Sequence, residues 1–113
     1  VRERTVQAQD MAVQTARQRT IQAEQRELAA KAALENAKIE IQTARIRLKR
    51  ADDLTKEGLA AQREMETATL NFQKAQADSI RNETVLESAR RDVEAAKNEE
   101  NRVIQQADAL IAE

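Results

Sequence analysis

The chain has 113 residues, 19 of them basic and 20 acidic, so its net charge is -1 although 35% of its side chains are charged. It has no Pro, Cys, His, Trp or Tyr, one Gly and one Phe, and such an Ala- and Glu-rich composition is typical of long helices rather than of a globular core. Without His or Cys the common metal and nucleophile sites cannot be built, and the interspersed charges do not attract nucleic acid. We therefore expect no enzyme, no cofactor, no metal and no nucleic-acid partner.

The ends of the sequence suggest a piece of a larger protein. Its first residue is Val1 rather than Met, and neither end carries a helix stop signal. It has no run of about 18 apolar residues and no charged-then-apolar leader. We expect an excised fragment whose parent holds the membrane anchor and the globular domains.

The first half of the sequence predicts a helix over about residues 2–56. Positions at alternating steps of three and four form an unbroken heptad pattern there. After Gln9, one of the two positions is Ala six times in succession, and the other is usually larger. The Ala positions are Ala16, Ala23, Ala30, Ala37, Ala44 and Ala51, and the larger positions are Val6, Val13, Leu34, Ile41 and Leu48, interrupted by Thr20 and Glu27. Regular Ala implies a closely packed partner helix.

A tip over about residues 57–60 is predicted next, because Gly58 is the natural left-handed residue just past a helix end. A second helix then follows over about residues 61–112. Its heptad positions again alternate in size: Ala61, Met65, Ala68, Phe72, Ala75, Ser79, Asn82, Leu86, Ala89, Val93, Ala96, Glu100, Val103, Ala107 and Leu110. We refer to the surface between the two helices as the seam.

Folding the chain back about Gly58 pairs a large residue with a small one along most of the seam. Opposed pairs are Ala51 with Met65, Leu48 with Ala68, Ala44 with Phe72, Ile41 with Ala75, Ala30 with Leu86, Ala23 with Val93 and Val6 with Leu110. Such complementarity fills an antiparallel seam without voids. The predicted fold is all-α, a single long antiparallel two-helix coiled-coil hairpin.

Two groups of residues depart from a simple seam. Polar seam positions, including Thr20, Glu27, Asn82 and Glu100, either fix the register or are partly solvated. Apolar residues on the outer surfaces either form a lateral packing surface or are scattered exposed side chains. The outer apolar residues are Ile21, Leu28, Ile39, Ile46, Leu70 and Ile80.

The tip carries a motif in which Arg50 is followed by Leu54 after four residues and by Ala61 after seven more, ahead of an acid and an Ala-rich helix. This stretch resembles the periplasmic adaptors, or membrane fusion proteins, of tripartite efflux and type I secretion systems, of the HlyD and AcrA/MacA kind. Their hairpins carry Arg, Leu and Ser at this spacing. Here Ala61 occupies the Ser position, so the role of that Ser does not carry over.

The resemblance implies a structural module without catalytic activity. Arg50 and Leu54, around Gly58 and Ala61, would contact a TolC-type outer-membrane channel. Lateral self-assembly would make a homo-oligomer, and the missing parts of the parent would bind an inner-membrane transporter. The location would be periplasmic, with the parent anchored to the inner membrane.

Other interpretations remain open on the residues alone. Arg50 and Leu54 also fit a solvated basic residue and the last apolar residue before a turn. A tRNA-binding helical arm of a synthetase-like enzyme is a second hypothesis, although Asp52 and Asp53 interrupt the basic run and no aromatic residue is near to stack a base. A coiled-coil spacer of a cytoskeletal or chromosome-organising protein is a third.

The second helix lacks a side-chain cap, which gives a test. If Ala61 is the N-cap, Ala61→Ser should stabilise the hairpin by about 1 kcal/mol, because the hydroxyl accepts a hydrogen bond from a free backbone amide. Thermal unfolding followed by circular dichroism measures this. An unchanged midpoint would show that the helix starts at another residue.

Overall fold

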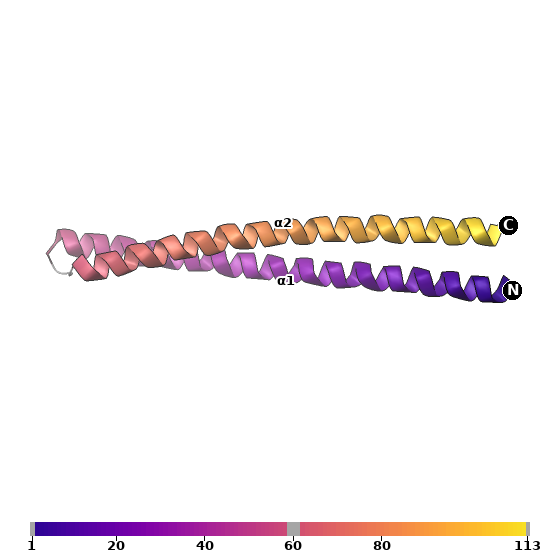
Figure 1. Ribbon diagram of the computed structural model, residues 1–113. Coiled ribbons are helices and arrows are strands. Elements are labelled where there is room, and N and C mark those ends of the chain that lie inside the picture. The colour runs from indigo at the N-terminus through magenta and orange to yellow at the C-terminus, as the bar shows by residue number, and fades with distance from the viewer. Residues whose placement is uncertain (1, 59–61, 113) are drawn as a thin grey trace. The chain divides into compact units, whose positions relative to one another are not determined.

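A computed structural model describes residues 2–58 and 62–112. Two α-helices account for almost all of these residues: α1 spans Arg2–Lys56 and α2 spans Gln62–Ala112 (Figure 1). Neither helix is interrupted by Pro or Gly, and both are rich in good helix formers. The prediction of an all-α antiparallel hairpin with its turn near Gly58 is confirmed.

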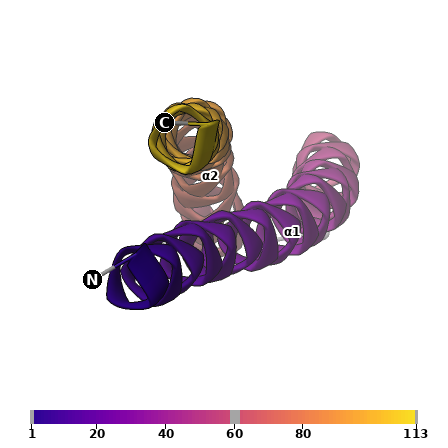
Figure 2. The same cartoon turned by 90° about the vertical axis from the view of Figure 1, so that its right-hand side faces the viewer.

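The chain divides into two compact units, and each contains a segment of both helices. Unit 1 is Val1–Ala29 with Glu87–Glu113, and unit 2 is Ala30–Leu86, which includes the turn. In each unit the α1 segment packs antiparallel against the α2 segment. Figure 2 looks at the end where α1 begins and α2 ends, so the segments of unit 1 lie nearest the viewer.

The turn begins with an ordinary helix end. The amide of Glu57 donates to the carbonyl of Asp53 at 3.1 Å, and the amide of Gly58 donates to the carbonyl of Thr55 at 3.0 Å. Gly58 has a φ of 74°, in the left-handed region that glycine enters without a steric penalty. Gly58 therefore ends α1 by the mechanism predicted from the sequence.

The core is a thin seam in which small residues predominate. The buried apolar residues are Ala16, Ala23, Ala30, Leu34, Ala37, Ala75, Leu86, Ala89, Val93 and Ala107. Thr20 and Ser79 are also buried at seam positions. Because Ala has almost no side chain, the two backbones can lie close together, and the larger residues fill the remaining space.

In unit 2 the large and small seam residues lie on different sides of the helix pair. In heptad notation, every seam Ala of α1 from Ala16 to Ala51 is at position d, whereas Leu34, Ile41 and Leu48 are at position a. On α2, Ala68 and Ala75 are likewise at d, and Met65, Phe72 and Leu86 are at a. In an antiparallel pair the d positions of both helices lie toward one side and the a positions toward the other. The seam positions predicted from the sequence alternate between large and small residues, but that alternation did not reveal their separation onto two sides.

Contacts between the helices agree with the predicted register. In unit 2 the Arg45 guanidinium lies over the Phe72 ring, 5.8 Å from its centroid. In unit 1, Arg17 Nε is 3.6 Å from Glu100 Oε1, and Arg90 Nε is 3.9 Å from Glu27 Oε1. In each pair the two residues are almost equally far from Gly58 along the chain, to well within one helical turn, as a chain folded back about Gly58 requires.

Three polar seam residues of unit 1, Thr20, Glu27 and Glu100, have partners. The Thr20 hydroxyl donates to Glu100 Oε2 at 3.0 Å and lies 3.2 Å from its own helix's Ala16 carbonyl. Glu27 and Glu100 are each within ion-pair distance of an Arg on the opposite helix. These acids therefore enter the seam without remaining unpaired, at a cost lower than that of an isolated buried charge.

One predicted seam residue lies outside the core. Leu110 is 44% exposed, whereas Ala107, one turn earlier, is buried. Near the end of α2 there is less of the partner helix to cover a side chain, and Arg2 already reaches the last turn, donating to the Ile111 carbonyl at 3.3 Å. The expected Val6–Leu110 packing is therefore incomplete, with Val6 half-buried.

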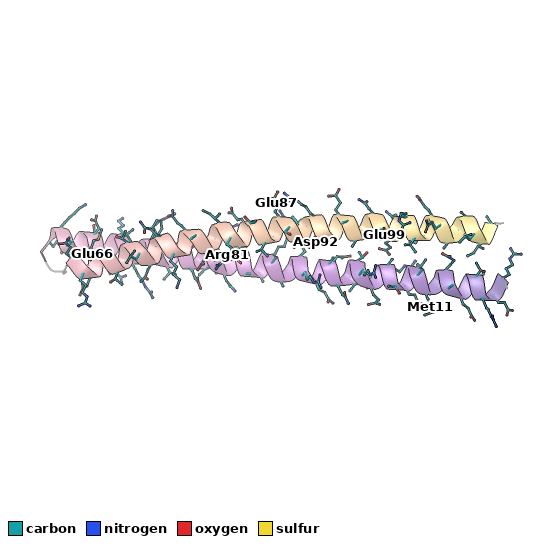
Figure 3. All side chains as sticks on the ribbon, in the orientation of Figure 1. Met11, Glu66, Arg81, Glu87, Asp92 and Glu99 are labelled. Atoms are coloured by element: carbon teal, nitrogen blue, oxygen red, sulfur yellow. The ribbon has the colours of Figure 1, made fainter. Side chains whose placement is uncertain are left out.

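The outer surfaces are exposed, as expected. In unit 1, Met11 on α1 and Glu87 on α2 point away from the other helix (Figure 3). The outer apolar residues named from the sequence, from Ile21 to Ile80, are all at least 46% exposed.

A matched pair of substitutions on α2 measures the seam. Leu86→Ala should destabilise the 113-residue chain by about 2–3 kcal/mol, because Leu86 is buried at the seam. Leu70→Ala makes the same chemical change on the same helix, but Leu70 is 64% exposed, so its cost should stay within about 0.5 kcal/mol. Chemical denaturation measures both, and equal losses would contradict the assignment of the seam.

Candidate partner-binding surfaces

Five surfaces of unit 2 are available for partners: the tip, a groove on one side of the helix pair, the opposite side of the pair, and the outer flank of each helix. The tip is built by the last two turns of α1. Arg50 is exposed and Leu54 is half-buried. Their spacing of four residues places them on one face of the helix.

Arg50 is available to a partner. Among residues 2–58 and 62–112 it has no hydrogen-bond or ion-pair partner. Lys56, by contrast, is held by its own helix, because its Nζ lies 3.0 Å from Asp52 Oδ2. This hydrogen bond to the Asp52 carboxylate, followed by its charge, raises the pKa of Lys56. Arg50 is therefore the unengaged cation beside Leu54.

Gly58 directs the chain away from α1 at the tip, with open space where a side chain would begin. The last turn of α1 is further fixed by the Thr55 hydroxyl, which donates to the Ala51 carbonyl at 2.7 Å. Ala61, the remaining tip residue named from the sequence, lies outside the described residues. The capping prediction at Ala61 therefore stays a prediction.

The seam residues named from the sequence differ in how deeply they are buried. Leu34, Leu86 and Val93 are buried. The residues closer to the tip are half-buried: Ile41, Ala44, Leu48, Ala51, Met65, Ala68 and Phe72. The seam is thus more accessible to solvent toward the tip, where the groove lies.

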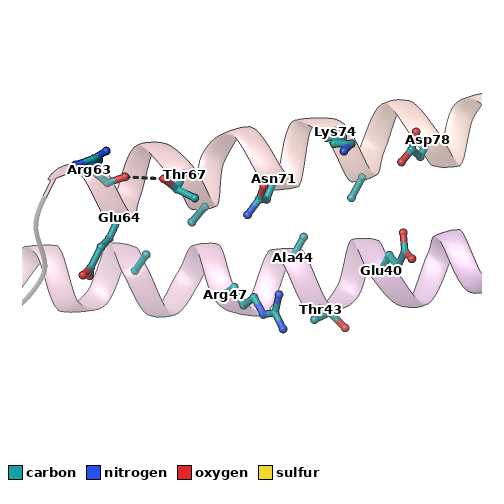
Figure 4. A pocket seen from close by; sticks show the side chains of 13 residues that line it. Glu40, Thr43, Ala44, Arg47, Arg63, Glu64, Thr67, Asn71, Lys74 and Asp78 are labelled. Atoms are coloured by element: carbon teal, nitrogen blue, oxygen red, sulfur yellow. Dashed lines mark hydrogen bonds between the residues drawn. The ribbon is translucent and has the colours of Figure 1, made fainter.

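The groove lies on the side of the seam where the d positions face solvent. Its cavity of about 870 Å³ has a floor of Ala44, Ala51, Ala68 and Ala75. Its walls are polar: Glu40, Thr43, Arg47, Arg63, Glu64, Thr67, Asn71, Lys74 and Asp78. Figure 4 shows Ala44 between the two helices, with the Thr67 hydroxyl donating to the Arg63 carbonyl at 3.0 Å. We call this side the groove face.

The groove continues toward the tip motif. Thr43, Arg47, Arg50 and Leu54 follow each other at steps of four, three and four residues, so they share one face of α1. The groove was not recognised from the sequence. The sequence feature that could have indicated the groove is Ala at successive d positions of both helices. On each helix, polar residues occupy the neighbouring positions on the side away from a.

The opposite side of the pair carries the larger seam residues and a fixed cation. The Arg45 guanidinium lies over Phe72, the only aromatic residue in the sequence, just within the distance of about 6 Å that defines a cation–π contact. Lys38 precedes Arg45 by one heptad, and Thr69 and Gln76 flank Phe72 at helical spacing. We call this side the Arg45 face.

The flanks face away from the seam. On α1 the flank consists of Ile39, Gln42 and Ile46. On α2 it consists of Leu70, Gln73, Ala77 and Ile80. The largest of these side chains are all about 60% exposed or more, and both flanks are free of charge. Uncharged apolar flanks are unusual on a chain that is 35% charged.

Two other kinds of site are absent from the part of the chain that the structure describes. No helix in this part is long and apolar enough to cross a membrane. The same part contains no cluster of three or more acidic side chains arranged to hold a metal ion.

Comparison with known families identifies the hairpin. A family model described as "RND MFP, alpha-helical hairpin domain" matches residues 27–96, which include the tip and all of unit 2. The match covers more than half of the chain. The chain belongs to this family of membrane fusion protein hairpins.

Membership fixes the coarse function. The chain is the helical hairpin of an RND membrane fusion protein, an adaptor of a non-catalytic family that works in tripartite efflux assemblies. The resemblance seen in the sequence covered type I secretion adaptors as well, and the matched family is the efflux kind. The family match also decides against the two alternative hypotheses, the tRNA-binding arm of a synthetase and the coiled-coil spacer. No individual curated protein matches the chain.

Proposed function

We propose that this hairpin links an inner-membrane transporter to a TolC-type outer-membrane channel from the periplasm. Its tip docks on the channel, and copies of the hairpin pack side by side. The tip assignment is supported by the exposure of Arg50, its lack of a partner within the described residues and its shared face with Leu54. Arg50 would donate charge-assisted hydrogen bonds to carbonyl or carboxylate oxygens, and Leu54 would enter an apolar groove.

The side-by-side packing is carried by one observation: the two apolar flanks of unit 2 lie at matching heights. The Arg45–Phe72 contact fixes the register, and in that register Ile46 is level with Leu70, and Ile39 with the turn from Ala77 to Ile80. Two copies with their tips level would therefore place the α1 flank of one against the α2 flank of the next. Apolar residues would meet apolar residues without a shift along the helices.

This contact uses different surfaces on the two copies. Each hairpin keeps a free flank after pairing, so further copies can be added until a ring closes. Each contact buries only a few large side chains, worth about 1.5–3 kcal/mol apiece when fully buried. Such an interface is small, so assembly would depend on the full-length adaptor and its partners.

Tip docking can be tested in the full-length parent. Arg50→Glu should weaken channel binding at least about tenfold, because a hydrogen bond to a charged group contributes about 1.5–3 kcal/mol. Leu54→Ala should also reduce cross-linking to the channel and export. Arg47→Glu is the matched control, since Arg47 lies on the same face about one turn further from the tip. Normal export and cross-linking in both tip variants would exclude the tip assignment.

Side-by-side packing has its own test. In the full-length adaptor, Ile46→Cys combined with Leu70→Cys should give a ladder of disulfide-linked oligomers on mild oxidation. Ile46→Cys alone should give none, because an α1 flank does not meet another α1 flank. Arg47→Cys with Asn71→Cys moves each thiol about 100° round its helix and should give no intermolecular ladder. A dimer from Ile46→Cys alone would indicate symmetric pairing and contradict the proposal.

A further inference from the structure

Stacking copies through their flanks leaves two broad faces of unit 2, and one of them must line the space inside the ring. One is the groove face, with its Ala floor. The other is the Arg45 face, where the guanidinium rests on Phe72. Each helix has two contact surfaces, the seam and the flank. The angle between them around the helix sets the direction in which a ring bends.

The α2 flank is not diametrically opposite the seam. Leu70 and Ala77 lie almost opposite it, but Ile80, 65% exposed, directly follows the seam residue Ser79 and so lies toward the Arg45 face. At the corresponding positions toward the groove face, α2 carries the cations Lys74 and Arg81. The apolar contact surface of α2 is therefore displaced toward the Arg45 face.

The displacement can be expressed as an angle. At 3.6 residues per turn, the centre of the α2 flank lies about 150° from the seam when measured through the Arg45 face, and about 210° when measured through the groove face. On α1, Gln42 extends the flank toward the Arg45 face. The residue at the same position one heptad nearer the tip is the charged Lys49. A closed ring of helices bends toward the side with the smaller angle.

We infer that the Arg45 face lines the conduit and that Arg45 forms a cationic band within it. This inference rests on the proposed side-by-side assembly. Arg45 is suited to the role because Phe72 holds it in place and no acid among the described residues forms an ion pair with it.

The acid on this face one heptad from Arg45 toward the tip is Asp52, and its carboxylate is engaged by Lys56 Nζ at 3.0 Å. Thr69 and Gln76, on the opposite helix, are neutral. Lys38, one heptad away, lies 3.9 Å from Glu35 and is partly neutralised. Repeated in every copy, Arg45 would give a ring of positive charge at one height. A charged ring with low-dielectric walls concentrates solutes of opposite sign, so the solutes favoured at this height carry anionic groups.

The groove face then lies on the outside of the ring. Its lining mixes both signs: the cations Arg47, Arg63 and Lys74, which have no ion pair within the described residues, lie beside the acids Glu40, Glu64 and Asp78, and Asp78 is paired with Arg81. The two faces therefore differ in accessibility and in local potential, and both differences can be measured with single cysteines.

The first test is accessibility in the assembled full-length adaptor. Gln76→Cys places a thiol on the Arg45 face and Asn71→Cys places one in the groove, and both replace an exposed neutral amide. A polyethylene glycol maleimide too bulky to enter the ring should label Gln76→Cys at least about tenfold more slowly than Asn71→Cys, whereas a small maleimide should label both. In the unassembled hairpin the two should react alike with either reagent. Slower labelling of Asn71→Cys, or equal labelling by the bulky reagent after assembly, would overturn the inference.

The second test reads the potential at Gln76→Cys with small anionic and cationic thiosulfonates. The anionic reagent should react faster, and Arg45→Gln should reduce this preference about tenfold. Arg47→Gln, two residues away on the groove face, should leave it unchanged. Equal effects of the two substitutions would overturn the cationic band. The cross-linking of Ile46→Cys with Leu70→Cys, measured in the same samples, shows whether the ring itself has formed, so a failure of assembly is distinguished from a wrong assignment of the faces.

Discussion

Close packing along an Ala-lined seam is the constraint on which the rest of this hairpin depends. Two helices without a third layer can bury only one narrow face each. With Ala at d and larger residues at a, the backbones approach closely, and few apolar side chains are needed. Individual ion pairs across the seam are partly exposed and contribute little by themselves. Their role is to give the acids Glu27 and Glu100 partners at positions that would otherwise be unfavourable for a charge.

A thin seam also leaves most of each helix free for other contacts. In unit 2 the same separation of large and small residues produces two different broad faces. Small d residues open a groove, while Phe72 on the other side supports Arg45. The flanks add two uncharged surfaces at matching heights. One packing rule therefore generates both the fold and the surfaces by which the hairpin can act.

The sequence predicted the fold well because the relevant signals were local and periodic. The heptad pattern identified both helices, and the left-handed conformation of Gly58 follows from the absence of a side chain. Exposure of residues such as Ile39 and Leu70 followed from their distance from the seam. The family could also be recognised from the spacing of Arg50 and Leu54, together with the hairpin itself.

Other features needed three-dimensional information. The groove depends on which side of the pair the Ala residues occupy, and a list of alternating large and small residues does not show this. Thr20 donates a hydrogen bond to Glu100, which lies about one turn away from the residue that folding back about Gly58 places opposite Thr20. Pairing large residues with small ones would therefore not find this bond. Leu110 fits the heptad, but its burial depends on how much of the partner helix surrounds it. The contact of Arg45 with Phe72 likewise depends on a side-chain direction that the heptad list leaves open.

Phe72 shows how a structural residue can set a functional property. At a seam position opposite small residues, a Leu would supply comparable apolar volume, so packing alone does not require an aromatic ring. A ring adds a face on which a guanidinium can rest while its charge stays in solvent. Arg45 is thereby held at a defined height without an acid to neutralise it. In the conduit inferred above, this charge would influence which solutes pass.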